Sequence, residues 1–164
     1  MKRTLKILIC SLLLLTLVCA AGCEAEPKTF TQNGFTITLT DEFEKADYGA
    51  YTAAYACEDM FLVALKEDFI YFEGEYGAHS SLMDYASLLI ESNDIDAKLT
   101  EEDGLVYYTY DIYNFETSEL MYTFLAAVYK TEDAFWSVQF AVDAHRFEEL
   151  KDDILVYARS VSFE

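Results

Sequence analysis

The most reactive side chains in this sequence belong to a few cysteine and histidine residues. Cys57 and His79 form the one conceivable thiol–imidazole pair. Nucleophilic catalysis requires such a pair to be in hydrogen-bond contact, with a third group that orients the base. The local sequence indicates no such arrangement, so Cys57 is interpreted as a small, buried hydrophobic residue. His145 precedes Arg146 at the start of a predicted helix, where a solvated residue is favoured over a catalytic base.

Acidic side chains occur in short clusters, which could bind a metal ion or cleave a glycoside. Ca²⁺ prefers about six to eight oxygen ligands, and Asp94-x-Asp96 begins like a calcium-binding loop. Lys98 and Leu99, however, stand where a ligand and the turn glycine are required. Glycoside cleavage depends on the spatial separation of two carboxylates, which the sequence does not give. Solvation is therefore the favoured role of these clusters, and we predict no metal site, no cofactor and no catalytic residue.

Tyrosine is abundant, with 13 residues, and several tyrosines alternate with other side chains along predicted strands. A large ring with a polar tip suits recognition. In the predicted strands 105–113 and 134–142, one of the two alternating sets of side chains is partly polar. If these two sets share a face of the sheet that a helix covers incompletely, they form an aromatic and amide surface. The alternative is that they line a second core beneath a helix. The candidate binding face consists of Tyr107, Thr109, Asp111, Tyr113, Phe135 and Gln139.

The start of the predicted domain is a hairpin of residues 29–32 and 35–39. Asn33-Gly34 lies between the two strands and is the strongest short turn signal, because both positions require a positive φ. Apolar residues alternate with threonines in the second strand, so this hairpin has one apolar face.

Two helices are predicted from the spacing of apolar residues. The first spans residues 81–93, where Ser81 and Asp84 fit a capping box and apolar residues recur on one face. The second spans residues 145–159 and has an acidic outer face.

Strands account for most of the remaining chain, and residues 120–130 are apolar on both alternating sets, as in a central strand covered on both sides. The predicted fold class is α+β, with a meander-rich antiparallel sheet of about six to eight strands between two main helices. The other predicted segments are a short helical turn at 41–46, a hairpin of 51–57 and 60–66, an aromatic loop at 68–79, and strands at 95–100, 105–113 and 134–142.

Length and charge limit the classes of function. The chain has 164 residues, the length of one ordinary domain, and a formal net charge of −19. Without residues 1–22, 30 acidic residues remain against 8 basic ones, a charge of −22. This charge disfavours nucleic-acid binding and electrostatic docking on anionic lipid. At 53% hydrophobic residues, the chain is too apolar for a disordered acidic tail.

The N-terminus has the layout of a secretory signal. Lys2, Arg3 and Lys6 precede an apolar run, and small residues follow it. The ending Ala20-Ala21-Gly22-Cys23 resembles the lipobox of bacterial lipoproteins, although Ala20 stands where leucine is usual. The resemblance implies that residues 1–22 are a signal peptide, that Cys23 carries lipid and that residues 23–28 form a short linker before one domain at 29–164. An uncleaved anchor and a plain secreted protein are the alternatives.

The order of predicted elements resembles the PsbP-like fold. The resemblance rests on Asn33-Gly34-Phe35-Thr36-Ile37, on the run that begins at Tyr122 and continues through Trp136, and on the ending Ser160-Val161-Ser162-Phe163. It implies an antiparallel sheet between helices, membrane association and a role in protein assembly or an unassigned role. It implies no shared active site.

We therefore expect a cell-envelope lipoprotein on the extracytoplasmic side of a bacterial membrane. It is expected to be a non-catalytic protein-binding or assembly module whose partners are the membrane, through lipid on Cys23, and another envelope protein. The alternative is a small-ligand or glycan binder that uses a tyrosine-lined sheet face. An exposed apolar patch would favour the first function, and an enclosed pocket with convergent polar groups the second.

Overall fold

The computed structural model describes residues 25–72 and 76–164. The expected signal peptide at 1–22 and the lipidation of Cys23 lie outside these residues. In chain order, the elements are β1 (Pro27–Gln32), β2 (Phe35–Thr40), β3 (Glu44–Lys45), β4 (Ala53–Ala56), β5 (Met60–Asp68), the 3₁₀ helix η1 (Phe69–Phe72), α2 (Leu82–Ser92), β6 (Lys98–Glu102), β7 (Leu105–Tyr113), β8 (Leu120–Lys130), β9 (Ala134–Asp143), the 3₁₀ helix η2 (Ala144–Arg146), α3 (Phe147–Arg159) and β10 (Ser162–Phe163).

The N-terminal hairpin is confirmed. β1 and β2 pair antiparallel around Asn33 and Gly34, whose φ values of 52° and 80° are those of a tight hairpin turn. Strand β1 begins at Pro27, so the last two residues of the expected linker belong to the sheet. The backbone of Glu26 is also held, because its carbonyl accepts a 2.8 Å hydrogen bond from the N–H of Asp41.

The strands form two antiparallel sheets. The larger sheet has seven strands in the order β3-β4-β5-β9-β8-β7-β6, and the smaller has the order β1-β2-β10. The α+β class is confirmed, although the separate three-stranded sheet is not foreseen in the sequence. The helical turn expected at residues 41–46 is wrong, because Glu44 and Lys45 pair with β4 as a short edge strand.

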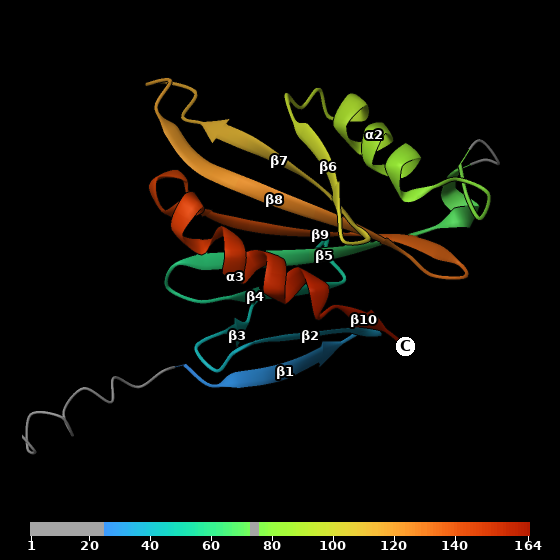
Figure 1. Cartoon of the computed structure of the whole chain (residues 1–164), viewed down its shortest axis with the longest axis horizontal. Coiled ribbons are helices and arrows are strands. Elements are labelled where there is room, and N and C mark those ends of the chain that lie inside the picture. The colour runs from blue at the N-terminus through green and yellow to red at the C-terminus, as the bar shows by residue number, and fades with distance from the viewer. Residues whose placement is uncertain (1–24, 73–75) are drawn as a thin grey trace, which may run out of the picture.

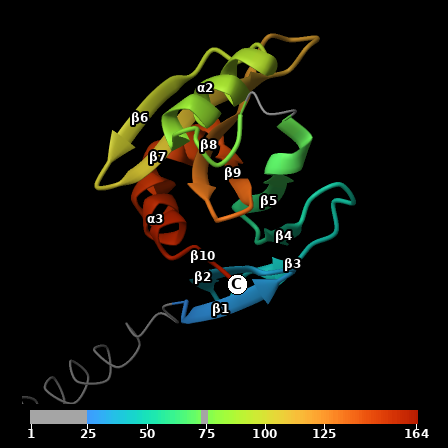
Figure 2. The same cartoon turned by 90° about the vertical axis from the view of Figure 1, so that its right-hand side faces the viewer.

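Each face of the seven-stranded sheet has its own cover (Figures 1 and 2). On one face, α3 and the three-stranded sheet enclose the main core, in which Phe35, Phe140 and Ile154 are fully buried. On the other face, α2 packs over β7 and β8, and Tyr85 and Ala86 are its buried residues. Because β8 contacts both layers, it is the central strand that its sequence predicts.

Helix α2 is well capped but short. Ser81 Oγ accepts from the backbone N–H of Asp84 at 3.1 Å, and Asp84 Oδ2 accepts from the N–H of Ser81 at 2.8 Å, which confirms the capping box. The 11 residues of α2 extend about 16 Å at 1.5 Å per residue. The 11 residues of β8 extend about 36 Å at 3.3 Å per residue. Strands β7 and β8 therefore continue past the helix (Figure 1).

Candidate functional site

The part of the sheet face that α2 leaves uncovered is rich in aromatic side chains. Four of its large residues are well exposed: Tyr48 at 49%, Tyr51 at 40%, Ile112 at 42% and Tyr122 at 39%. Three further rings are partly buried among them. We call this surface the open aromatic face, and it consists of Tyr48, Tyr51, Phe61, Tyr110, Ile112, Tyr122 and Phe124.

Five rings of the open aromatic face are in continuous contact across three strands and the loop before β4. Phe61 on β5 lies 5.8 Å from Phe124 on β8, between ring centroids, and 6.1 Å from Tyr48. Phe124 stacks on Tyr110 of β7 at 4.9 Å and 16°. These contacts fix the rings relative to one another, so little side-chain entropy remains to be lost when a partner binds.

The buried polar group of this face is the hydroxyl of Tyr110. The Tyr110 hydroxyl donates to Gln139 Oε1 at 3.0 Å, and burial raises the pKa of Tyr110 above its ordinary value. Burial also raises the pKa of the neighbouring Tyr108 to about 12, with a smaller contribution from the charge of Glu67. The surface therefore offers apolar rings and uncharged hydroxyl and amide groups.

A hollow of about 700 Å³ opens at the Phe61 end of this face. Its aromatic wall is formed by Tyr48, Phe61 and Tyr122, and Cys57, Glu58, Asp59 and Asp143 also line it. Strand β9 contributes Ala141, which pairs with both Phe61 and Phe124.

The candidate binding face predicted from the sequence is not assembled, because its two sets lie on opposite faces of the sheet. Through β8, Tyr107 aligns with Val138, whereas Gln139 aligns with Tyr108. Side chains that align across neighbouring strands point to the same face of the sheet, whereas consecutive side chains along one strand point to opposite faces. The premise that the β7 set and the β9 set share a face is therefore wrong.

On the α3 side of the sheet lie Tyr107, Thr109 and Asp111. Tyr107 is 5% exposed in the main core and donates to Glu102 Oε2 at 3.1 Å. Thr109 and Asp111 line a separate cavity of about 470 Å³, where Asp111 Oδ1 accepts from Thr123 Oγ1 at 2.6 Å. This cavity opens on the other side of the sheet from the open aromatic face.

The remaining predicted residues are also separated. Phe135 is fully buried beneath α2 and stacks on Tyr85 at 4.3 Å. Tyr113 is exposed beyond an irregularity in the pairing of β7 with β8. Only Gln139 touches the open aromatic face, through Tyr110. The sequence does contain a signal for the residues of the open aromatic face that were not predicted. The first predicted helix is too short to cover strands of this length, so part of the sheet face must remain uncovered.

The thiol–imidazole pair is not brought together. Cys57 follows β4 at one end of β5, whereas the loop that holds His79 meets Lys130 at the other end. The nine residues of β5 extend about 30 Å between them. Burial raises the pKa of the Cys57 thiol, which keeps it protonated. Within residues 25–72 and 76–164, no group of three or more His, Cys, Asp or Glu residues could hold a metal ion.

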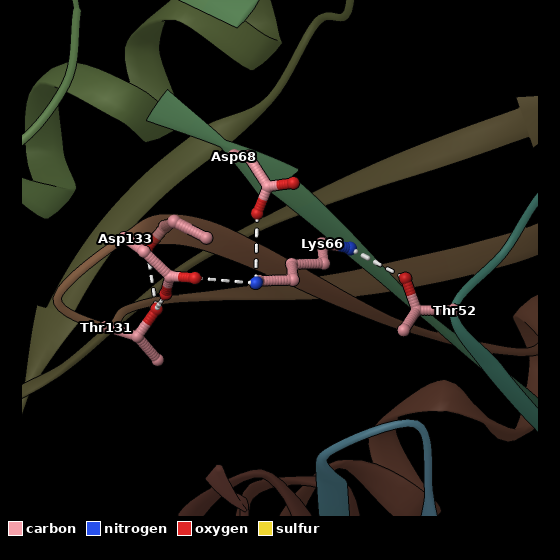
Figure 3. Close-up of polar contacts among 6 residues, drawn as sticks. Thr52, Lys66, Asp68, Thr131 and Asp133 are labelled. Atoms are coloured by element: carbon pink, nitrogen blue, oxygen red, sulfur yellow. Dashed lines mark hydrogen bonds and ion pairs between the residues drawn. The ribbon is translucent and has the colours of Figure 1, made fainter. Parts of the chain in front are cut away.

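A second polar site lies at the far end of β5 (Figure 3). Lys66 Nζ contacts Asp133 Oδ2 at 2.8 Å and Asp68 Oδ1 at 2.9 Å, and the Lys66 backbone N–H donates to Thr52 Oγ1 at 3.0 Å. Hydrogen bonds to Asp133 and Asp68 raise the pKa of Lys66, while the Lys66 ammonium lowers that of Asp133. Because the ammonium is held by two carboxylates, this site ties β5 to the β8–β9 turn.

The fold is of the PsbP-like class. A solution structure of cyanobacterial PsbP (CyanoP) from Synechocystis sp. PCC 6803 matches with a TM-score of 0.57 and 14% identity, over 88% of this chain and 96% of that chain. A crystal structure of a protein from Bacteroides thetaiotaomicron matches with a TM-score of 0.54 and 14% identity, over 84% of this chain. The match covers 48% of the Bacteroides chain.

These likenesses show the fold alone. No model of a protein family matches the sequence, and no curated protein sequence matches it. No helix among the described residues is both long and apolar enough to cross a membrane.

Proposed function

We propose that this protein is a membrane-anchored extracytoplasmic lipoprotein that binds another envelope protein through the open aromatic face, without catalysing a reaction. The observation that carries the proposal is the uncovered half of the sheet face, where Tyr48, Tyr51 and Tyr122 remain exposed around Phe61 and Phe124. Contiguous exposed apolar surface on a soluble domain marks an interaction site. Tyrosine is enriched in protein interfaces because it combines contact area with a hydrogen-bonding tip.

A protein partner is favoured over a small ligand or glycan because of the shape of the surface. Small-molecule sites enclose most of their ligand and present a few convergent polar groups. Here the rings extend over β5, β7 and β8, and the hollow at the Phe61 end is open to solvent. An extended surface of this kind supports contact with another folded surface.

The anchor in this proposal is lipid on Cys23. Two acyl chains hold a protein stably at a membrane, whereas one gives only reversible binding. The domain begins at β1, four residues after Cys23. The short linker would therefore keep the whole domain close to the bilayer.

The test is purification of the full chain from detergent-solubilised native membranes, followed by mass spectrometry of the co-purifying proteins. We expect one stoichiometric partner, lost with Tyr122→Ala. Tyr71→Ala is the matched control, because Tyr71 is a 76% exposed tyrosine on η1, outside the open aromatic face. Cys23→Ala tests the anchor and should release the protein from the membrane. Recovery of a lone lipidated chain, or an equal loss of partner with Tyr71→Ala, would contradict the proposal.

A further inference from the structure

The hollow beside Phe61 combines aromatic rings with carboxylates. The ring of Phe61 lies 6.1 Å from that of Tyr48 and 6.4 Å from that of Tyr122, with interplanar angles of 58° and 75°. Pairing places Ala56 on one side of Phe61 and Ala141 on the other. Ala56 and Ala141 both line the hollow, so small side chains form part of its lining next to the rings. Ring faces carry partial negative charge and attract cations.

Carboxylates form the rim of the same hollow. Glu58 and Asp59 come from the β4–β5 turn, and Asp143 is the last residue of β9. Asp143 Oδ1 accepts from the backbone N–H of His145 at 2.8 Å. The rim therefore carries three carboxylates against one guanidinium, that of Arg146, which also lines the hollow.

The rim already holds one guanidinium of this chain. Arg146 pairs with Asp59 and contacts Glu149 Oε1 at 3.0 Å. Glu58 and Asp143 are not part of this pairing and lie on the same hollow. A carboxylate–guanidinium pair is thus present in the hollow beside two further carboxylates, of which Asp143 also accepts from the His145 N–H.

We infer that this hollow receives an arginine side chain of the protein partner, which stacks on Tyr122, contacts the Phe61 ring and is neutralised by Glu58 and Asp143. The inference rests on the proposed function, because the arginine belongs to the protein that docks on the open aromatic face. Guanidinium suits the site better than ammonium, since it is planar, stacks on rings and forms forked hydrogen bonds with carboxylates. The charge of −22 outside residues 1–22 steers a cationic partner toward the domain.

The test uses the full chain in detergent micelles and three labelled peptides with the sequence Gly-Ser-Phe-Xaa-Phe-Ser-Gly, where Xaa is arginine, lysine or citrulline. Citrulline has nearly the shape of arginine without its charge. Fluorescence anisotropy should show at least fivefold tighter binding of the arginine peptide than of the citrulline peptide. The double variant Glu58→Gln with Asp143→Asn should reduce this ratio below two. Asn retains an oxygen that can accept from the His145 N–H.

The matched control is Asp152→Asn with Asp153→Asn, which removes the same charge from exposed positions on α3. The control should keep the fivefold ratio. Equal binding of the arginine and citrulline peptides, or no binding of either at millimolar concentration, would overturn the inference. Equal binding of the lysine peptide would overturn the choice of guanidinium.

The two proposals fail separately. If the membrane partner depends on Tyr122 but the peptides show no arginine preference, only the arginine inference is wrong. If the arginine preference holds in the hollow but the native membranes yield no partner, the proposed function is wrong, and with it the assignment of the arginine to a partner protein, while the guanidinium selectivity of the hollow stands.

Discussion

The sheet face on which α2 packs has two halves, one covered by the helix and one open. Both halves are lined by stacked aromatic rings, but the rings are buried in the covered half and partly exposed in the open half. In the covered half, Phe135 is fully buried and stacks on Tyr85 of the helix. In the open half, Phe124 stacks on Tyr110 with a similar geometry, but no helix among the described residues lies over them and both are partly exposed. The difference shows that one helix of 11 residues completes the core under half of the face. The rings of the other half contribute less to folding and remain accessible to a partner.

The largest expected effect comes from truncating one ring in each half. Phe135→Ala removes a ring that contacts Tyr85, Phe69 and Phe72 in a closed cluster, and should lower the free energy of unfolding by about 3–5 kcal/mol. Phe124→Ala should cost about 1–2 kcal/mol, since part of that ring already contacts water. Urea unfolding followed by the fluorescence of Trp136, the one tryptophan, measures both. Equal losses would show that the two halves do not differ.

The next effect concerns hydroxyl groups. The Tyr85 hydroxyl donates to the Glu67 carboxylate beneath α2, so Tyr85→Phe leaves a partly buried carboxylate without this donor. The expected loss is about 1.5–3 kcal/mol, the range for hydrogen bonds to charged groups. Tyr110→Phe in the open half removes a bond to the neutral amide of Gln139 and should cost about 0.5–1.5 kcal/mol. A larger loss with Tyr110→Phe in the same unfolding assay would reverse the comparison.

The sequence predicts the elements better than the site, for a physical reason. The capping box at Ser81 and the turn at Asn33 depend on neighbouring residues, and both are confirmed. The face that Gln139 occupies depends instead on pairing across two turns. A shift of one residue in register moves every side chain of a strand to the other face. The predicted alternation of side chains within β7 and within β9 is correct, but the sequence alone does not show which set of β7 lies on the same face as which set of β9.

The separate three-stranded sheet depends on long-range contacts in the same way. Only Ser162 and Phe163 join β10 to β2, and these residues are adjacent to β2 only in the folded chain. The extent of the open aromatic face was predictable in principle, because strand and helix lengths follow from the sequence. That estimate indicates an uncovered area, but it does not identify which of the tyrosines lie in it.

Alkaline pH should weaken the covered half. The pKa of Tyr108 is raised by burial to about 12 in the folded protein, above the ordinary value near 10 in the unfolded chain. The stabilisation is therefore complete below about pH 10 and is lost as the pH rises toward 12, by about 2 kcal/mol. Tyr108→Phe should reduce this slope in urea unfolding measured from pH 9 to pH 12. An unchanged slope would show that Tyr108 does not titrate with folding.

The smallest expected effect is that of Tyr122→Ala on the free energy of unfolding. It decides whether the exposed rings of the open half serve folding or binding. Tyr122 is 39% exposed and touches Phe61 only at 6.4 Å between ring centroids. Its truncation should lower the free energy of unfolding by less than about 1 kcal/mol, because little buried area is lost. The same substitution is expected to abolish recovery of the partner. A loss above about 2 kcal/mol in urea unfolding would assign Tyr122 to the core, and the exposed rings would then be explained by folding rather than by binding.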